Sequence, residues 1–417
     1  MRAIPAETPL QTTSLAASTE VPLLNMSRPS TLFLDGMRGL AALYVLLRHV
    51  TWVPAADTSG PTWRHILRLL EHAFRYGHLA VIFFFVLSGF VIHLRFAKQI
   101  QKNPATATFG WGEFVYRRIR RLYPPLLAAI LITWLCDLAG TAMGFHLFYA
   151  GHGGDFSALP DAMRYNHRLP TLLGNLTFIM QMHAQVWGTD NPLWSLAYEW
   201  WFYMLYPLLW RLSRRSIALA TGFVFIAFLL TRLPGTWPGI QDGTYPFSGW
   251  GMLSLPRRVF AALPAWWCGV LLADIYAGRL RISFKSLAPL TLALGAMFIS
   301  GAPEAIKAAL AGIGFCGAIS LGFYLQQQGL KLTILNKLKG LGDFSYTLYV
   351  THWPIVIFLT PWWARHAEAK FPGSAPMGLV FLTLVPLVIA YVAHLFVEKP
   401  FTKKNTAGKR TGCEKSN

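Results

Sequence analysis

Ten stretches of this 417-residue chain are apolar for long enough to cross a lipid bilayer, and this pattern constrains the fold more than any other feature. A membrane-spanning helix needs roughly 20 mostly apolar residues. Runs of this length are too long for the strands of a membrane barrel, so each span must be a helix. The spans are residues 32–53, 78–96, 122–142, 192–210, 216–233, 258–277, 286–301, 305–325, 343–363 and 377–397.

The amount of charge agrees with burial in lipid. Only 13% of the residues are charged, whereas an ordinary soluble domain carries about 25%. The chain therefore lacks the polar surface that a water-soluble protein of this size needs. We predict an all-α, polytopic membrane protein with about ten transmembrane helices in one bundle.

A weaker apolar stretch, residues 171–187, carries Asn175, Gln181, His183 and Gln185. We interpret it as a re-entrant or interfacial segment within a long outer loop, residues 143–191. If it crossed the membrane, the loops that follow would invert and the basic residues around Arg211 would face outwards.

The formal net charge of +19 is compatible with nucleic-acid binding or with basic cytoplasmic loops. The position of the charges distinguishes these possibilities. When both termini are cytoplasmic, most of the 37 Lys and Arg residues fall in the inner loops and tails, as membrane topology requires. We therefore expect a multi-pass membrane protein with both termini in the cytoplasm, with the lipid bilayer as partner and no nucleic acid.

The ends of the chain differ from its centre in composition. Residues 1–30 are polar and lack the features of a signal peptide, which predicts a disordered cytoplasmic leader. Residues 31–400 form one membrane domain, and residues 401–417 form a basic cytoplasmic tail. The four cysteines have neither disulfide nor zinc spacing, so no metal is expected.

Ionisable residues inside membrane spans are costly and often functional. In the first span, Arg38 and His49 are eleven residues apart, which places them on one face of a helix with a rise of about 16 Å between them. Asp35, three residues before Arg38, can pair with it. A purely structural Asp–Arg pair and a snorkelling His would explain the same pattern. The functional interpretation is that Arg38 holds an anionic acyl donor while His49 removes a proton from an acceptor hydroxyl.

An arginine cluster precedes the third span on its cytoplasmic side. Four arginines fall within five residues, namely Arg117, Arg118, Arg120 and Arg121. Such a cluster can anchor the span at anionic lipids. It can also clamp the phosphates of coenzyme A, because arginine binds phosphate in a bidentate manner.

Three further motifs carry polar groups. The fourth span contains Trp194, Ser195 and Glu199, and a carboxylate in lipid must face the bundle, in a structural or a catalytic pairing. The ninth span contains Tyr346 and His352, where a helix-to-helix hydrogen bond is the alternative to a catalytic base. In the second span, Ser88 and Gly89 follow three phenylalanines, a pattern that also suits close helix packing.

Together these five patterns resemble the acyltransferase-3 family, the polytopic membrane O-acyltransferases that include bacterial O-antigen and exopolysaccharide acetylases. Arg38 and His49 match the family's Arg-x10-His signature. The other matches are Phe84 to Phe90, Arg117 to Pro124, Trp194 to Glu199, Ser345 to Pro354 and Phe396 to Pro400.

The resemblance implies ten core helices in a bacterial inner (plasma) membrane, an acyl-CoA donor and His49 as catalytic base. Arg38 and the Arg117–Arg121 cluster would contact the donor. Many relatives carry a fused extracytoplasmic domain, whereas this chain ends shortly after Pro400, so we expect any second transfer step to be absent or to occur in trans.

We therefore expect a membrane O-acyltransferase that moves an acyl group, by expectation acetyl, from acetyl-CoA to a hydroxyl of an extracytoplasmic carbohydrate. The acceptor would be exopolysaccharide, lipopolysaccharide O-antigen or a lipid-linked glycan. His49 would be the base, with Glu199 or Asp35 orienting it or balancing charge. The predicted substrate-binding residues are Ser88, Trp194, Ser195, Tyr346 and His352.

Two alternatives remain open on the sequence. A secondary transporter or flippase could use His and Glu as a proton relay, although transporters usually contain internal repeats and none is visible here. An acyltransferase could also act on a small metabolite such as a macrolide.

Overall fold

The computed structural model describes residues 29–52, 61–145, 147–150, 156–158, 162–233, 254–299, 303–368 and 375–402. The leader predicted over residues 1–30 and the basic tail predicted over residues 401–417 lie almost wholly outside the described residues.

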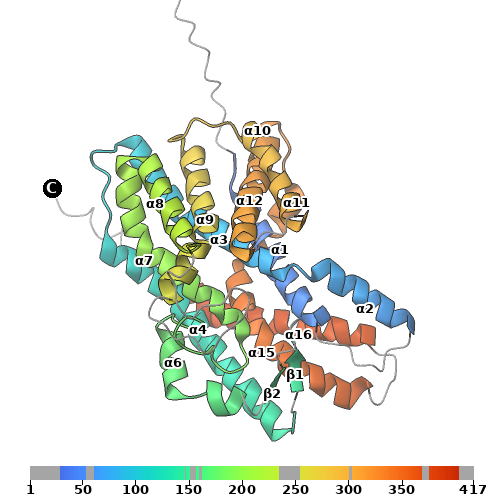
Figure 1. Cartoon of the computed structure of the whole chain (residues 1–417). Coiled ribbons are helices and arrows are strands. Elements are labelled where there is room, and N and C mark those ends of the chain that lie inside the picture. Colours follow the sequence, from blue (N-terminus) through green and yellow to red (C-terminus); the bar gives the residue numbers. More distant parts are fainter. Residues whose placement is uncertain are drawn as a thin grey trace, which may run out of the picture.

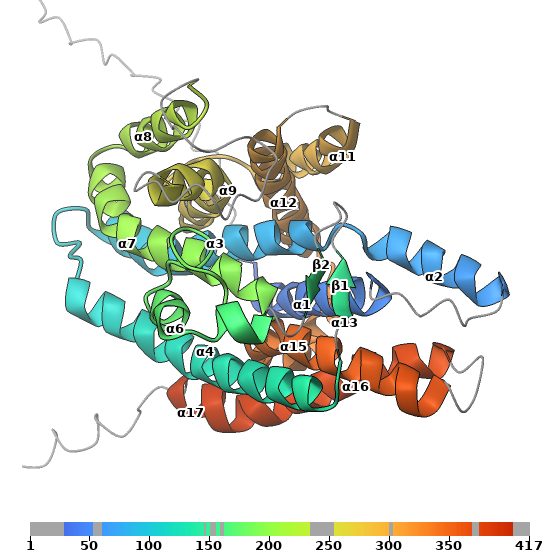
Figure 2. The same cartoon turned by 60° about the horizontal axis from the view of Figure 1, so that its bottom comes forward.

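Long helices make up the bundle (Figure 1). They are α1 (Leu32–Trp52), α3 (Gly77–Lys102), α4 (Trp111–Ala142), α7 (Trp194–Arg215), α8 (Ile217–Leu230), α9 (Ser254–Ala277), α12 (Glu304–Gln327), α15 (Ser345–Trp363) and α16 (Ala375–Ala393). Each covers most of one predicted span, and apart from the start of α4 their ends lie close to the ends of those spans. Figure 2 shows α1 and α3 between a layer of α4, α15 and α16 and a layer of α9, α11 and α12.

Shorter elements connect the long helices. The α-helices are α2 (Pro61–Phe74), α6 (Leu169–Leu176), α10 (Phe284–Leu287), α11 (Leu292–Ile299), α13 (Thr333–Lys337), α14 (Lys339–Asp343) and α17 (Lys399–Thr402). The 3₁₀ and π turns are η1 (Ala162–Asn166), η2 (Asn191–Leu193), η3 (Ala288–Thr291), η4 (Ala364–Glu368) and η5 (His394–Glu398). Two short strands, β1 (Leu147–Ala150) and β2 (Phe156–Ala158), pair antiparallel within the long loop after α4.

The protein is a helical membrane protein, as predicted. Among the described residues, five helices are long and apolar enough to cross a bilayer, and two shorter apolar helices accompany them. The five are Arg68–Lys102, Trp111–Ala142, Leu255–Ala277, Glu304–Gln327 and Pro376–Phe401. A total of ten crossings stays a prediction.

Three long helices run in the same direction. Arg38 and His49 of α1 contact Ser345 and His352 of α15, in the same order along both helices. Helix α4 runs parallel to α15, because the Tyr346 hydroxyl contacts the Leu122 carbonyl and Arg365, just beyond α15, donates to the Met143 carbonyl just beyond α4.

Another group of helices runs the opposite way. Ser88 and His93 of α3 contact Glu199 and Tyr206 of α7, and also Trp266 and Asp274 of α9, each time in ascending order. Helix α3 is antiparallel to α1, because Phe33 and Phe90 both pack on Phe323 while Arg48 packs beside Gly77. Since α4 and α7 run oppositely, residues 169–193 between them return to the side where α4 ends. This agrees with a segment that does not span.

Helices α3 and α9 pack together through glycine. A Cβ atom at Gly89 would collide with the Trp266 carbonyl, and one at Gly269 would collide with the Val86 carbonyl. The backbones can approach this closely only because both positions lack a side chain. The close-packing interpretation of Ser88-Gly89 is therefore confirmed, and it places Ser88 at the centre of the bundle.

Two predicted spans differ in detail. Residues 286–301 are not one helix, because Pro289 falls in η3, which joins α10 to α11. The third helix begins at Trp111 rather than near residue 122, so the arginine cluster lies within α4.

Candidate active site

A pocket opens between α1, α3, α4, α7 and α15 and contains about 850 Å³ of space that no protein atom fills, including solvent at its mouth. Its wall combines apolar side chains with charged and hydroxyl groups. Seven of the sequence-predicted site residues line it, namely Asp35, Arg38, Ser88, Arg121, Ser195, Glu199 and Tyr346. Residues of α1 and α15, which are about 300 positions apart in the chain, thus meet in one pocket.

Arg38 is held at one end of the pocket by the start of α15. Its guanidinium donates to the Gly342 carbonyl at 2.6 Å and to the Ser345 hydroxyl at 3.0 Å, and it lies 3.6 Å from the Asp35 carboxylate. Gly342 packs on the Asp35 carbonyl so closely that a side chain there would collide with it. The predicted Asp35–Arg38 pair therefore exists, as a loose contact beside stronger hydrogen bonds to α14 and α15.

Glu199 lies among hydroxyl groups in the middle of the pocket. It accepts from the Ser88 hydroxyl at 3.2 Å and from the Tyr203 hydroxyl at closer range. The Trp266 indole donates to Ser88 at 3.3 Å. The carboxylate faces the bundle, as its cost in lipid requires, and this geometry is compatible with both the structural and the catalytic interpretation.

The four arginines of α4 do not act as one group. Arg121 lines the pocket, where it interacts electrostatically with Glu199. Arg118 stacks over the rings of Phe114 and Tyr203. Arg117 forms an ion pair with Glu113 at 2.9 Å and, like Arg120, does not line the pocket. Of the four arginines predicted to clamp phosphate, only Arg121 therefore lies in the pocket wall, and the others lie outside it.

His49 forms a pair with His352. Nδ1 of His49 lies 2.7 Å from Nε2 of His352, and the two rings stack at 5.0 Å. Trp353 packs on the other side of His49 at 4.3 Å between ring centroids. Arg38 and His49 thus both face α15, in agreement with the shared face predicted from their spacing.

The histidine pair is next to the pocket but is not part of its wall. Tyr349 lines the pocket, and its ring lies 6.1 Å from His352 and 5.6 Å from Phe84. The Tyr349 ring therefore lies in the pocket wall next to His352.

The start of α7 fixes Tyr349. The Ser195 hydroxyl donates to the Tyr349 hydroxyl at 2.8 Å, and the Tyr349 hydroxyl contacts the Pro192 carbonyl at 3.2 Å. Trp194 does not line the pocket and packs edge-on against Tyr198. Ser195 therefore fixes the Tyr349 hydroxyl, whereas Trp194 packs outside the pocket wall.

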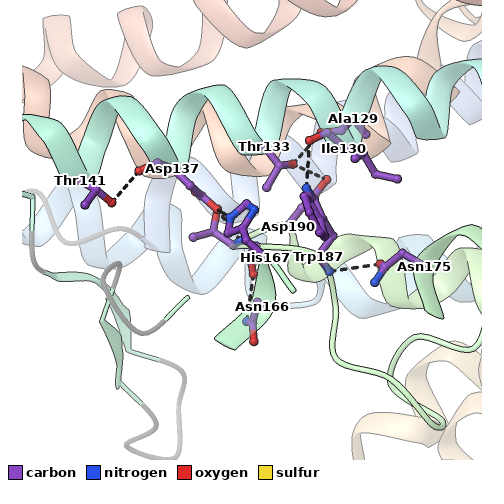
Figure 3. A network of polar contacts seen from close by, with 12 residues as sticks. Ala129, Ile130, Thr133, Asp137, Thr141, Asn166, His167, Asn175, Trp187 and Asp190 are labelled. Carbon is purple, nitrogen blue, oxygen red and sulfur yellow. Dashed lines mark hydrogen bonds and ion pairs between the residues drawn. The ribbon is translucent and has the colours of Figure 1, made fainter. Parts of the chain in front are cut away.

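A polar network that the sequence interpretation missed joins the loop before α7 to α4 (Figure 3). The Asp137 carboxylate accepts from the Thr189 backbone at 3.0 Å, from the Thr189 hydroxyl at 2.7 Å and from His167 at 2.9 Å. Three donors satisfy this buried carboxylate. The network fixes the segment that leads to Pro192 and Ser195.

Asp190 lies in the same loop with far less support. It is fully buried. Within the described part of the chain, its one side-chain donor is the Thr133 hydroxyl at 3.4 Å, and its Oδ1 atom has no hydrogen-bond partner. Burial, followed by repulsion from Asp137, holds the pKa of the Asp190 carboxyl well above its usual range. The carboxyl is therefore neutral at pH values where an exposed aspartate is ionised.

A second missed network joins α3, α7 and α9. His93 bridges the Tyr206 hydroxyl and Asp274 at 2.8 Å each, and Arg279 pairs with Asp274 at 2.6 Å. All of these charges are at or near complete burial. Asp137, His93 and Asp274 lie within predicted spans, so a systematic search for ionisable groups in those spans would have found them.

The arrangement can hold an anionic, partly apolar ligand beside Arg38 and Arg121. Hydroxyl groups and a carboxylate line the middle of the pocket, and a pair of imidazoles lies next to the Tyr349 ring of its wall. No set of three His, Cys, Asp or Glu side chains in the described part of the chain is placed to hold a metal ion.

Comparison with known proteins identifies the class. The model of the acyltransferase-3 family, described as an acyltransferase domain, matches residues 31–395, and the chain belongs to this family. The protein is thus an acyltransferase that transfers groups other than aminoacyl groups.

Individual relatives are distant. Acyltransferase MdmB of Streptomyces mycarofaciens is 25% identical over 88% of this chain and 90% of its own length. Peptidoglycan O-acetyltransferase OatA of Listeria monocytogenes is 24% identical over 89% of this chain, and a putative peptidoglycan O-acetyltransferase, YrhL of Bacillus subtilis, is 23% identical over 88%. The chain spans about half the length of these two peptidoglycan relatives, 55% and 54%. No solved structure matches.

Proposed function

We propose that this enzyme transfers an acetyl group from acetyl-CoA to a hydroxyl of a carbohydrate outside the cytoplasm, such as exopolysaccharide or lipopolysaccharide O-antigen. One observation carries the proposal: Arg38 and His49 face the same helix from two levels of α1, and the Arg38 level opens into a pocket. An anion site and a base at different depths suit a donor and an acceptor that arrive from opposite sides of a membrane.

The pocket suits the donor. Arg38 and Arg121 supply positive charge, and the apolar wall beside them suits the thin pantetheine arm of coenzyme A. Arg118 and Arg117 lie on the preceding turn of α4, where phosphates outside the pocket would meet them. The donor would enter from the end at which α1 begins, which the positive-inside rule assigns to the cytoplasm.

The transfer needs one base. His49 accepts the proton of the acceptor hydroxyl while the oxygen attacks the thioester carbonyl carbon. The carbon–sulfur bond breaks, coenzyme A leaves as thiolate, and the proton from His49 restores the thiol. The balance is thioester plus alcohol to ester plus thiol. Glu199 and its hydroxyl partners would orient the donor or balance the charge on Arg121.

The acceptor class is supported by the relatives. Two of them are named peptidoglycan O-acetyltransferases, and peptidoglycan is a carbohydrate polymer outside the cytoplasm. Membership of an acyltransferase family also favours transfer over the transporter alternative.

The test uses membranes that contain the full chain and [14C]acetyl-CoA. We expect His49→Ala to reduce base-labile radioactivity in the carbohydrate fraction by at least about 100-fold, the contribution typical of general-base catalysis. His366→Ala, an exposed histidine beyond α15, is the matched control and should retain normal transfer. Transfer at the normal level by His49→Ala would remove His49 from the mechanism.

The acceptor is tested by deleting the gene and comparing ester-linked acetate in surface polysaccharides. Loss of acetate from polysaccharide would support the proposal. Loss of acetate from a secreted small molecule, detected by mass spectrometry with polysaccharide unchanged, would contradict the carbohydrate acceptor.

A further inference from the structure

The contacts of His352 determine which of its ring nitrogens carries hydrogen. Nδ1 of His352 lies 3.0 Å from the Leu348 carbonyl oxygen, one helical turn back along α15. A carbonyl oxygen can only accept, so Nδ1 must be the protonated nitrogen. His352 has 1% of its surface exposed, and no carboxylate in the described part of the chain forms an ion pair with it. A charged imidazolium is costly in such surroundings, so the ring is neutral and its Nε2 is an acceptor.

The acceptor on His352 then fixes His49. Nε2 of His352 lies 2.7 Å from Nδ1 of His49, so the hydrogen between the two rings belongs to His49 Nδ1. A neutral His49 with hydrogen on Nδ1 carries its lone pair on Nε2. The alternative tautomer, with hydrogen on Nε2, would bring two lone pairs together at 2.7 Å.

We propose that His352 is a positioning residue that holds His49 in the Nδ1-protonated tautomer, so that Nε2 of His49 is the atom that accepts the proton of the acceptor hydroxyl. This inference rests on the proposed function of His49 as base. It changes the role expected for His352 from substrate binding to orientation of the base.

The same contact stabilises the product of proton transfer. When His49 becomes an imidazolium, its Nδ1 hydrogen still points to an acceptor, and the bond becomes charge-assisted. Trp353 on the far side of His49 restricts rotation of the ring, because it packs at 4.3 Å. The base is therefore fixed in tautomer and in orientation by two consecutive residues of α15. In serine proteases, a substitution that leaves the catalytic histidine in the wrong tautomer reduces kcat by about 10⁴-fold.

The first experiment compares two substitutions of similar size in membranes supplied with [14C]acetyl-CoA. Gln at position 352 can accept from His49 Nδ1 through its amide oxygen, and Met cannot. We expect His352→Gln to retain transfer within about 10-fold of wild type and His352→Met to lose about 100-fold or more in kcat, with similar KM for acetyl-CoA. Equal activity of the two variants, whether high or low, would overturn the proposal.

The second experiment observes the tautomer directly and does not depend on activity. Solid-state NMR of protein labelled with 15N-histidine resolves protonated from unprotonated ring nitrogens, and His49→Ala identifies the His49 signals by their loss. We expect His49 to be protonated at Nδ1 in the wild type and in His352→Gln, and at Nε2 in His352→Met. Protonation at Nε2 in the wild type would contradict the proposal.

The two experiments separate this inference from the proposed function. If His49→Ala remains active, the base assignment fails. If His49→Ala is inactive and His352→Met retains full activity, only the role of His352 fails.

Discussion

Arg38 uses its guanidinium for hydrogen bonds to Gly342 of α14 and Ser345 at the start of α15 while it lines the pocket. Only a planar, multiply donating group can make both contacts and still present positive charge to a ligand. Position 38 therefore requires arginine, and lysine cannot replace it fully.

Replacement of Arg38 by Lys should weaken donor binding. The ammonium group cannot reproduce both hydrogen bonds, so we expect the KM for acetyl-CoA to rise by about 10-fold, the equivalent of one charged hydrogen bond. Initial-rate measurements in detergent or nanodiscs give this value. Arg95→Lys, the same exchange at an exposed site on α3, should leave KM unchanged. An unchanged KM in Arg38→Lys would argue against a donor contact.

Asp190 supplies a prediction about pH. Its pKa is raised in the folded protein, so burial of the ionised form costs stability once the pH rises above the carboxyl's unfolded value of about 3.9. Asp190→Asn keeps an acceptor for Thr133 without the charge. We expect this variant to raise Tm at pH 7.5 by roughly 1–3 °C and to have a smaller effect at pH 4.5. Thermal unfolding at the two pH values checks it, and an equal shift at both would contradict the assignment.

The spacing of single residues predicted part of the site. The spacing of eleven residues from Arg38 to His49 implied a common face, and both residues do contact α15. The sequence could not predict which side chains α15 would offer, because the pairing of His49 with His352 depends on two helices separated by about 300 residues. The division of the arginine cluster was equally hidden, because it depends on how α4 is rotated against α7.

Helix boundaries followed hydropathy closely except where charge or proline intervened. The sequence indicated a helix start near residue 122, because the arginines made the preceding stretch polar. In the structure α4 begins eleven residues earlier, since its arginines alternate between the pocket, the Tyr203 ring and an ion pair with Glu113. Charged residues on one turn of a helix can thus serve three environments.

The contact of α3 with α9 is a prediction at the scale of an element. A methyl group at Gly269 would overlap the Val86 carbonyl, so Gly269→Ala should separate the helices and destabilise the protein by about 1–3 kcal/mol. The displacement would also move Ser88 away from Glu199 and reduce activity.

Gly222 in α8 provides the matched control, because a Cβ atom there meets no other atom within 4 Å. Gly222→Ala should leave stability unchanged or raise it slightly, as alanine favours helix. Denaturation of the two variants in the same detergent is the measurement. Equal changes in stability for the two variants would show that the close approach of α3 and α9 does not stabilise the protein.

At the scale of the whole molecule, the directions of the helices follow the predicted order of spans. Helices α1, α4 and α15 correspond to the first, third and ninth predicted spans and run one way. Helices α3, α7, α9 and α12 correspond to even-numbered spans and run the other way. For α12 this follows because Phe315 and Phe323 pack on Phe83 and Phe90 of α3 in the same order. The sequence could predict this alternation because basic loops recur on one side, whereas the packing order of the helices depends on contacts that no local pattern encodes.

The topology predicts which loops face outwards. Thr106, between α3 and α4, should be cytoplasmic, and Arg168, just before α6, should be outside. In a chain without its native cysteines, a membrane-impermeant maleimide applied to spheroplasts should label Arg168→Cys and not Thr106→Cys. The reverse pattern would invert the orientation, and labelling of both would contradict the number of crossings between them.

The contact of Phe84 with Tyr349 has a consequence for the energetics of the cell. A continuous water-filled route from the pocket to the far side would let protons leak down the gradient that the host membrane maintains. The rings of Phe84 and Tyr349 place apolar surface in the pocket wall next to His352, where such a route would have to pass. We therefore expect the Tyr349 ring, which Ser195 holds through a hydrogen bond, to limit proton leakage through the protein.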